Sequence, residues 1–188
     1  MKRALLVLTI PVAPGATLHA QLPAPPDHWG NGLGFGVVAG LSAPTGDFAK
    51  LAERGSTVSG LLTYQQPYER LGLRGEASLS QFTYRNMPNA RARIVSATAN
   101  VVDFSPSYMG LYILGGVGIY HASSVGDACT TTATKGGLNF GFGLRMELGG
   151  AEALFEARVH HIAGRLDPTN SGLNSGTSFY PFSFGLKF

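Results

Sequence analysis

The chain has 188 residues, of which 13% are charged and 26 are glycine, and its net charge is +3. This length is sufficient for one domain with its own core. The charged fraction is about half of the usual quarter, which argues against a secreted soluble domain, because such a domain needs more charge on its surface. The small net charge gives no basic patch for nucleic acid. Low charge without a long apolar run is typical of a membrane protein that is not helical.

The first 20 residues have the pattern of a secretory signal peptide. Met1, Lys2 and Arg3 form a basic start, residues 4–10 form a short apolar run, and residues 18–20 resemble a cleavage site. The apolar run is too short to span a bilayer. Cleavage after residue 20 would lower the net charge to +1, because it removes Lys2 and Arg3. An uncleaved anchor or leader is the alternative interpretation.

Residues 21–30 are rich in proline and predict an extended leader, followed by a single domain over residues 31–188. In that domain the dominant hydrophobic period is two, which indicates β-strands, and no window supports a long helix. The alternating stretches predict eight strands, at about 31–43, 56–67, 71–84, 92–104, 111–123, 137–148, 152–164 and 178–188.

The predicted connections alternate between long and short. The first, third, fifth and seventh are long and polar, whereas the second, fourth and sixth are shorter, which is typical of an outer-membrane barrel. An even strand number places both termini on the short-turn side. The long connections are expected to present charged side chains outward: Lys50, Glu53, Arg54, Arg85, Arg91, Arg93, Lys135, Arg165 and Asp167.

The sixth and seventh strands specify their own register. If Gly149 and Gly150 form a two-residue hairpin turn, Leu144 faces Phe155 and Phe142 faces Ala157 on one side of the sheet. A slip by one residue would place charged side chains on that apolar face. The other face pairs glycine with large side chains, as a crowded barrel interior requires.

The polar faces of the strands hold opposite charges separated by Gly and Ser. These faces are too sparse for a solvated surface, so we expect them to line a narrow interior while the apolar faces meet lipid. Their charges should pair, because an isolated buried charge is costly. The expected interior network consists of Arg74, Glu76, Arg145, Glu147, Glu156, Arg158, His160 and Lys187.

The last strand ends on alternating large apolar residues, namely Tyr180, Phe182, Phe184, Leu186 and Phe188. With the strand pattern, this ending resembles the small OmpA/OmpX-type eight-stranded outer-membrane barrels, over residues 31–188. The resemblance implies that these five residues form the C-terminal signal recognised by the outer-membrane assembly machinery. It also implies contact with outer-membrane lipid and lipopolysaccharide. Pro181 departs from a regular strand, because it removes a ladder donor.

Two histidine motifs contain residue types that occur in reactive sites. His121 and Ser123 match the His-x-Ser of a family of lipid A deacylase barrels, but no acidic residue is expected nearby to orient the histidine. His160 and His161 are adjacent on a strand and point to opposite faces, so they cannot share a metal ion. Cys129 lies alone in a polar loop and is interpreted as a free thiol or an intermolecular disulfide. No motif predicts a cofactor or a metal.

We therefore predict an all-β, eight-stranded antiparallel up-and-down transmembrane barrel, directed to the bacterial outer membrane, with a structural or surface-interaction role. A lipid A-modifying hydrolase and a secreted soluble lipocalin-like carrier are the alternatives.

Overall fold

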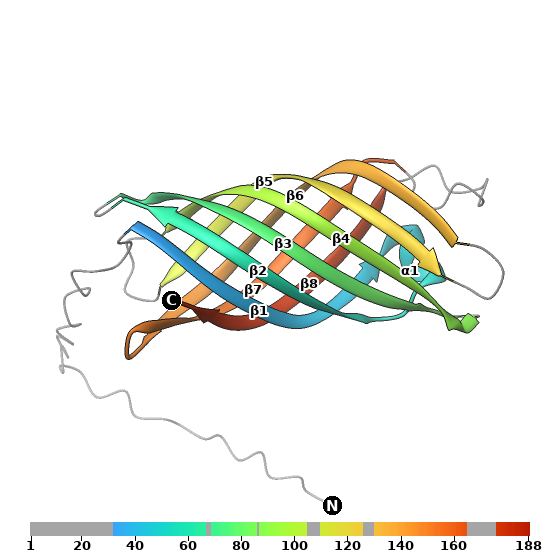
Figure 1. The fold of residues 1–188 in the computed structure, drawn as a ribbon, viewed down its shortest axis with the longest axis horizontal. Coiled ribbons are helices and arrows are strands. Elements are labelled where there is room, and N and C mark those ends of the chain that lie inside the picture. Colours follow the sequence, from blue (N-terminus) through green and yellow to red (C-terminus); the bar gives the residue numbers. More distant parts are fainter. Residues whose placement is uncertain (1–31, 67–68, 86, 105–109, 126–129, 165–175) are drawn as a thin grey trace, which may run out of the picture.

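The computed structural model of the chain describes residues 32–66, 69–85, 87–104, 110–125, 130–164 and 176–188. Eight antiparallel strands follow one another around a closed barrel, and β1 pairs with β8 to complete it (Figure 1). The fold class is confirmed. The strands are β1 (Gly32–Thr45), β2 (Gly55–Gln65), β3 (Leu71–Tyr84), β4 (Met87–Phe104), β5 (Leu111–Val125), β6 (Thr130–Leu148), β7 (Ala151–Ile162) and β8 (Thr177–Lys187). The predicted signal peptide and leader, Cys129, Arg165 and Asp167 lie outside the described residues.

The hairpin between β6 and β7 has the predicted register. Leu144 pairs with Phe155 and Phe142 pairs with Ala157. Gly149 and Gly150 form the turn with φ angles of 58° and 102°, a left-handed conformation that glycine adopts without the steric cost of a side chain. The local turn chemistry and the apolar face therefore specify the same pairing.

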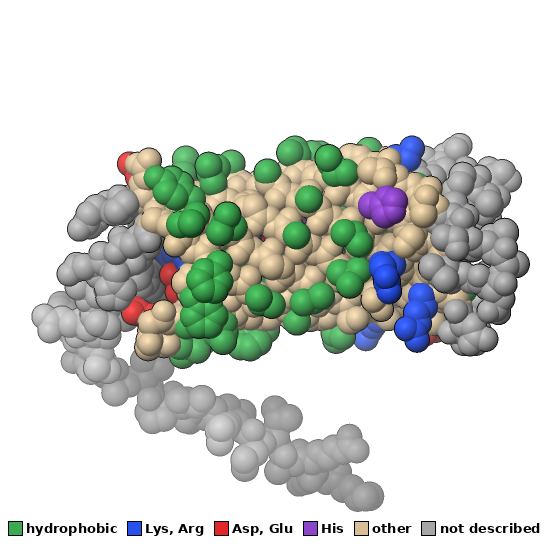
Figure 2. Space-filling view, viewed as in Figure 1, with side chains coloured by type: hydrophobic (Ala, Val, Ile, Leu, Met, Phe, Trp, Pro, Cys, Tyr) green, Lys and Arg blue, Asp and Glu red, His purple; other side chains and the backbone are tan. Residues whose placement is uncertain are grey.

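The outer wall of the barrel is apolar. Leu33 is 70% exposed, and Phe35 and Ile119 are each 63% exposed, all pointing away from the interior. Figure 2 shows hydrophobic side chains spread over the middle of the visible face. A closed barrel leaves no sheet edge unpaired, so its backbone polar groups are satisfied within lipid. The interpretation as a soluble carrier is wrong, because a carrier would turn these apolar faces inward.

Two strand starts differ clearly from the sequence prediction. β4 begins at Met87 and β6 begins at Thr130, several residues before the expected starts, so Arg91, Arg93 and Lys135 lie on strands and not in loops. A tilted strand crosses a bilayer with about nine to eleven residues, whereas β4 has 18 and β6 has 19. The extra length projects beyond the apolar wall, where outward side chains meet water and no apolar alternation is needed.

A short helix, α1 (Gly46–Leu51), occupies part of the connection between β1 and β2, which was predicted as a loop. Phe48 of α1 packs against Phe82, with ring centroids 5.0 Å apart. The backbone NH of Arg85 donates to the carbonyl of Leu51 at 2.9 Å, so α1 is fastened to the end of β3. No helix among the described residues is long and apolar enough to cross a membrane.

The interior consists of three layers, as the inward positions of β4 show. Ala92 and Ile94 belong to an apolar cluster near α1, Ser96 to Asn100 lie in a polar middle layer, and Val102 belongs to a second apolar cluster. We call these clusters the outer apolar cluster (Ala52, Phe82, Ala92, Ile94, Tyr120, Ala122, Ile162 and Phe179) and the inner apolar cluster (Val38, Leu61, Val102, Tyr112, Leu114 and Leu154). The interior is therefore not polar throughout as the sequence suggested: apolar clusters lie on both sides of the polar middle layer, although the buried polar side chains of Gln65 and Arg145 lie near the end that carries the C-terminus.

Candidate functional site

The end of the barrel that carries α1 is opposite the end where the C-terminus lies (Figure 1). The turn of Gly149 and Gly150 and the shorter connections lie with the C-terminus, which is the periplasmic side of outer-membrane barrels. We call the α1 end the outer end and the C-terminal end the inner end.

The outward face of β4, β5 and β6 changes from apolar to polar near the outer end. Val95, His121 and Thr134 pair across the three strands, and His121 Nδ1 lies 2.8 Å from Thr134 Oγ1. On the neighbouring wall His161 Nδ1 lies 2.9 Å from Ser178 Oγ. These exposed histidines and hydroxyls mark the outer limit of the apolar wall, where polar side chains meet lipid headgroups.

Two exposed arginines follow directly beyond this limit. Arg93 pairs with Ser123 of β5, which pairs with Thr132 of β6. Arg91 lies two residues further out on the same face of β4, and both arginines are exposed. We call the face formed by Arg91, Arg93, His121, Ser123, Thr132 and Thr134 the outer polar face. It combines guanidinium and hydroxyl donors, which suit phosphate and sulfate oxygens.

Charge is segregated between the two ends of the described structure. The outer end carries six basic and two acidic residues, whereas the inner end carries two basic and four acidic residues on its rim. Figure 2 shows Lys and Arg side chains gathered toward the outer end of the visible face. The outer residues are Lys50, Arg54, Arg85, Arg91, Arg93 and Lys135 with Asp47 and Glu53; the inner ones are Arg70 and Lys187 with Glu69, Asp103, Glu147 and Glu152.

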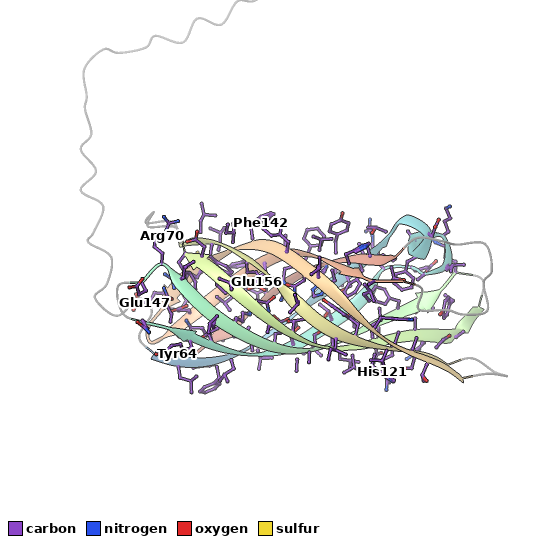
Figure 3. All side chains as sticks on the ribbon, turned by 90° about the horizontal axis from the view of Figure 1, so that it is seen from above. Tyr64, Arg70, His121, Phe142, Glu147 and Glu156 are labelled. Carbon is purple, nitrogen blue, oxygen red and sulfur yellow. The ribbon has the colours of Figure 1, made fainter. Side chains whose placement is uncertain are left out.

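Within the barrel, the middle layer contains a continuous ion-pair network. Arg74 binds Glu156 through two hydrogen bonds and lies 3.0 Å from Glu76, which also binds Arg158. Tyr112 donates to Glu156, and Arg158 donates to Asn139 at 2.6 Å. Figure 3 shows Glu156 inside the barrel, whereas Phe142 points outward from the wall. Two cations and two anions thus neutralise one another away from water.

The remaining residues of the expected network lie elsewhere. His160 is buried beside it, stacked on Phe179 at 4.9 Å with Tyr120 Oη 2.9 Å from its Nδ1.

Three other residues that the sequence predicts in the network lie at or near the inner rim. Glu147 is exposed at the inner rim and not in the interior (Figure 3), and Lys187 binds Glu152 there at 2.9 Å. Arg145 is buried near that rim with its guanidinium 4.0 Å from the ring centre of Phe104. The strand period predicts which face of the sheet a side chain occupies, but not its position along the barrel axis. Glu147, Lys187 and Arg145 are separated from the network by that position.

Sequence reasoning left Tyr112 and Asn139 out of the network. Tyr112 pairs with Gly143, and a side chain at Gly143 would collide with the Tyr112 ring. The pairing of a large residue with a glycine could have indicated that Tyr112 reaches the network, because glycine has no side chain and leaves room for the Tyr112 ring to extend across the interior.

The five residues of the expected C-terminal signal all lie on the outer wall of β8 and at its end. Tyr180, Phe182, Phe184, Leu186 and Phe188 are each more than a third exposed. Phe188 exchanges two backbone hydrogen bonds with Phe35, at 2.7 and 3.0 Å, and so also closes the seam between β1 and β8. Pro181 pairs with Ser42 of β1 near the outer end of β8.

The structure places His121 and Ser123 on one face, and among the described residues no carboxylate pairs with either to act as the third member of a hydrolase triad. Their cross-strand neighbours are Val95, Thr134, Arg93 and Thr132, none of which is a carboxylate. His160 is buried whereas His161 is exposed, so the two rings point to opposite faces. The described residues contain no group of three or more His, Cys, Asp and Glu side chains able to hold a metal ion.

No protein-family model matches the chain, and no curated protein is similar to it in sequence. Solved structures match its fold. Neisserial surface protein A matches with a TM-score of 0.65 and 12% identity, over 85% of this chain and 97% of its own. Ail, the attachment invasion locus protein of Yersinia pestis, matches with a TM-score of 0.54 and 18% identity, over 84% of this chain and 99% of its own.

Ail is an outer-membrane protein that was also solved in a phospholipid bilayer nanodisc and in complex with the heparin analogue sucrose octasulfate. At these identities the likeness concerns the fold, and it confirms the predicted resemblance to small outer-membrane barrels. The closed barrel, its apolar outer wall and this fold together place the chain in the bacterial outer membrane.

Proposed function

We propose that this outer-membrane barrel is a non-conducting surface protein whose outer polar face binds the anionic groups of lipopolysaccharide. Its role is structural or interactive, and catalysis has no part in it. The observation that carries the proposal is the position of Arg91 and Arg93, exposed on the outward face of β4 directly beyond the apolar wall.

The chemistry of the outer polar face supports an anionic sugar-lipid. Side chains at this height lie beside the headgroups of the outer leaflet, whose phosphate groups are matched by the fork of donors on each guanidinium. Ser123 and Thr132 add hydroxyl donors in the same row as Arg93. The excess of basic over acidic side chains among the described residues of the outer end attracts negative charge over a longer distance.

The structure of Ail with a sulfated sugar supports the same chemical class, since it shows that a barrel of similar fold accommodates a polyanionic saccharide. For this chain the inference rests on its own arginines, because a shared fold alone does not transfer a binding site.

The packed interior supports a role that does not involve conduction. The outer apolar cluster contains Phe82, Tyr120 and Phe179, each at most 2% exposed. Beneath it, a cavity of about 10 Å³ lies beside Glu76 and Arg158, which is at the lower limit for a single water molecule. An eight-stranded barrel has room for side chains only.

The test replaces both arginines of the outer polar face, Arg91→Gln with Arg93→Gln, in barrels reconstituted in phospholipid vesicles. We expect the affinity for lipopolysaccharide to fall about tenfold or more, because each cation near an anionic surface contributes about 1 kcal/mol. Arg70→Gln at the inner end is the matched control and should leave the affinity unchanged. Equal loss in both variants, or no loss in either, would contradict the proposal. The mass of the recovered lipid A should also be unchanged, since a loss of acyl chains would favour the hydrolase alternative.

A further inference from the structure

The inner mouth of the barrel contains a cavity that the outer polar face does not use. Its volume is about 210 Å³, and it is bordered by the starts of β1, β3 and β7 and by the ends of β2, β4, β6 and β8. Arg145, Gln65 and Phe104 line it, with Glu147, Glu152 and Lys187 around the entrance. The cavity is large enough for a small organic group and opens on the side of the short turns.

Two buried polar side chains give the cavity its chemistry. Arg145 is only 6% exposed and stacks on Phe104 at 4.0 Å. Gln65 is 7% exposed; its amide nitrogen donates to the carbonyl of Glu69 at 2.7 Å, while its Oε1 has no hydrogen-bond partner among the described residues. A buried acceptor without a donor is costly, so a ligand with an N–H group would be stabilised there. A guanidinium in the same cavity suits an oxyanion.

We infer that the inner mouth binds the carboxyl terminus of a peptide, with the carboxylate on Arg145 and the last peptide N–H donated to Gln65 Oε1. A singly charged carboxylate fits better than a phosphate, because Glu147 and Glu152 at the entrance repel a second negative charge. A peptide N–H fits better beside Gln65 Oε1 than a free ammonium does. Both glutamates lie at the rim and so would leave a buried ammonium unpaired, which is strongly disfavoured. The apolar wall of Val102 and Phe104 accommodates a small aliphatic side chain.

The site is separate from the outer polar face, so the two proposals can fail independently. The interior ion-pair network and the inner apolar cluster lie between them. A peptide bound at the inner mouth therefore has no path to the outer surface and stays a partner on the periplasmic side.

The test titrates N-acetyl-alanyl-alanine into the full-length folded barrel in detergent and follows binding by calorimetry or NMR. We expect saturable binding that the carboxamide form of the same peptide weakens by about tenfold or more, since hydrogen bonds to charged groups are the stronger ones. This comparison needs no variant and so does not depend on folding. No saturable binding at millimolar peptide, or equal binding of acid and amide, would overturn the inference.

Two variants assign the contacts. Arg145→Met should reduce the acid to the affinity of the amide, and Gln65→Leu should weaken acid and amide alike. Arg70→Met is the matched control, because Arg70 lies at the same end but does not line the cavity and binds Asp103 at 3.0 Å. Folding of Arg145→Met is checked by the change in gel mobility that a folded barrel shows on heating. If this variant does not fold, Gln65→Leu and the comparison of the acid with the amide peptide test the inference instead. Full binding by a folded Arg145→Met would also overturn the inference.

Discussion

At the scale of single residues, the interior ion-pair network has the greatest energetic consequence. Glu156 accepts hydrogen bonds from Arg74 and Tyr112, and the side chains of Arg74 and Glu156 are 3% and 1% exposed. The net contribution of a buried pair is small, because desolvation offsets the attraction. Removing one partner is costly, because it leaves an uncompensated charge.

Glu156→Gln should therefore destabilise the barrel by about 3–5 kcal/mol. The exposed pair of Arg70 and Asp103 gives the control, since Asp103→Asn should cost below about 1 kcal/mol. Urea unfolding in lipid vesicles, read from the mobility of unheated samples on gels, measures both. Adding Arg74→Met to Glu156→Gln should restore part of the loss. Equal costs for the buried and the exposed change would mean that the network is hydrated.

At the scale of elements, glycine on one strand faces a large side chain on its neighbour, which lets side chains fill a narrow interior. Gly143 of β6 pairs with Tyr112 of β5 and with Glu156 of β7. The pairing of Gly143 with Glu156 could be predicted from the Gly149–Gly150 turn and the apolar alternation. The early starts of β4 and β6 could not, because outside the membrane the outward positions need not be apolar.

Gly143→Ala should destabilise the barrel by about 1–3 kcal/mol, because the added methyl group meets the Tyr112 ring and forces it to shift. Gly75→Ala on β3 is the matched control, since nothing lies within 4 Å of a Cβ added there. The same gel-based unfolding measurement applies. A neutral Gly143→Ala would show that Tyr112 repacks without loss and that its contact with Glu156 is dispensable.

The end of β8 combines a structural contact with a proposed signal, and one substitution separates them. Phe188→Ala keeps the backbone bonds to Phe35 and loses the ring contact at 5.7 Å. We expect the purified variant to refold in detergent nearly as well as the parent, whereas the amount assembled in the outer membrane of cells falls severalfold. Gel mobility of both preparations measures this. Normal assembly in cells would contradict a signal role for Phe188.

At the scale of the whole molecule, the sequence was informative wherever the environment imposes a repeating rule. Lipid requires apolar side chains such as Phe142 at every second position, and this alternation predicted the eight strands and the barrel. Depth along the axis follows no such rule. For that reason Glu147 and Arg158 looked equivalent in sequence, although one lies at the inner rim and the other in the network.

The central claim is that the apolar faces meet lipid while the charged faces are enclosed. Spin labels at single cysteines, introduced in a Cys129→Ser background at Phe142 on the wall and at Thr132 on the outer polar face beyond it, test this in bilayers. We predict that the Phe142 label is relaxed by oxygen and shielded from a water-soluble nickel reagent, with the reverse at Thr132. A Phe142 label that is open to the nickel reagent would contradict the account, because that side chain would then face water.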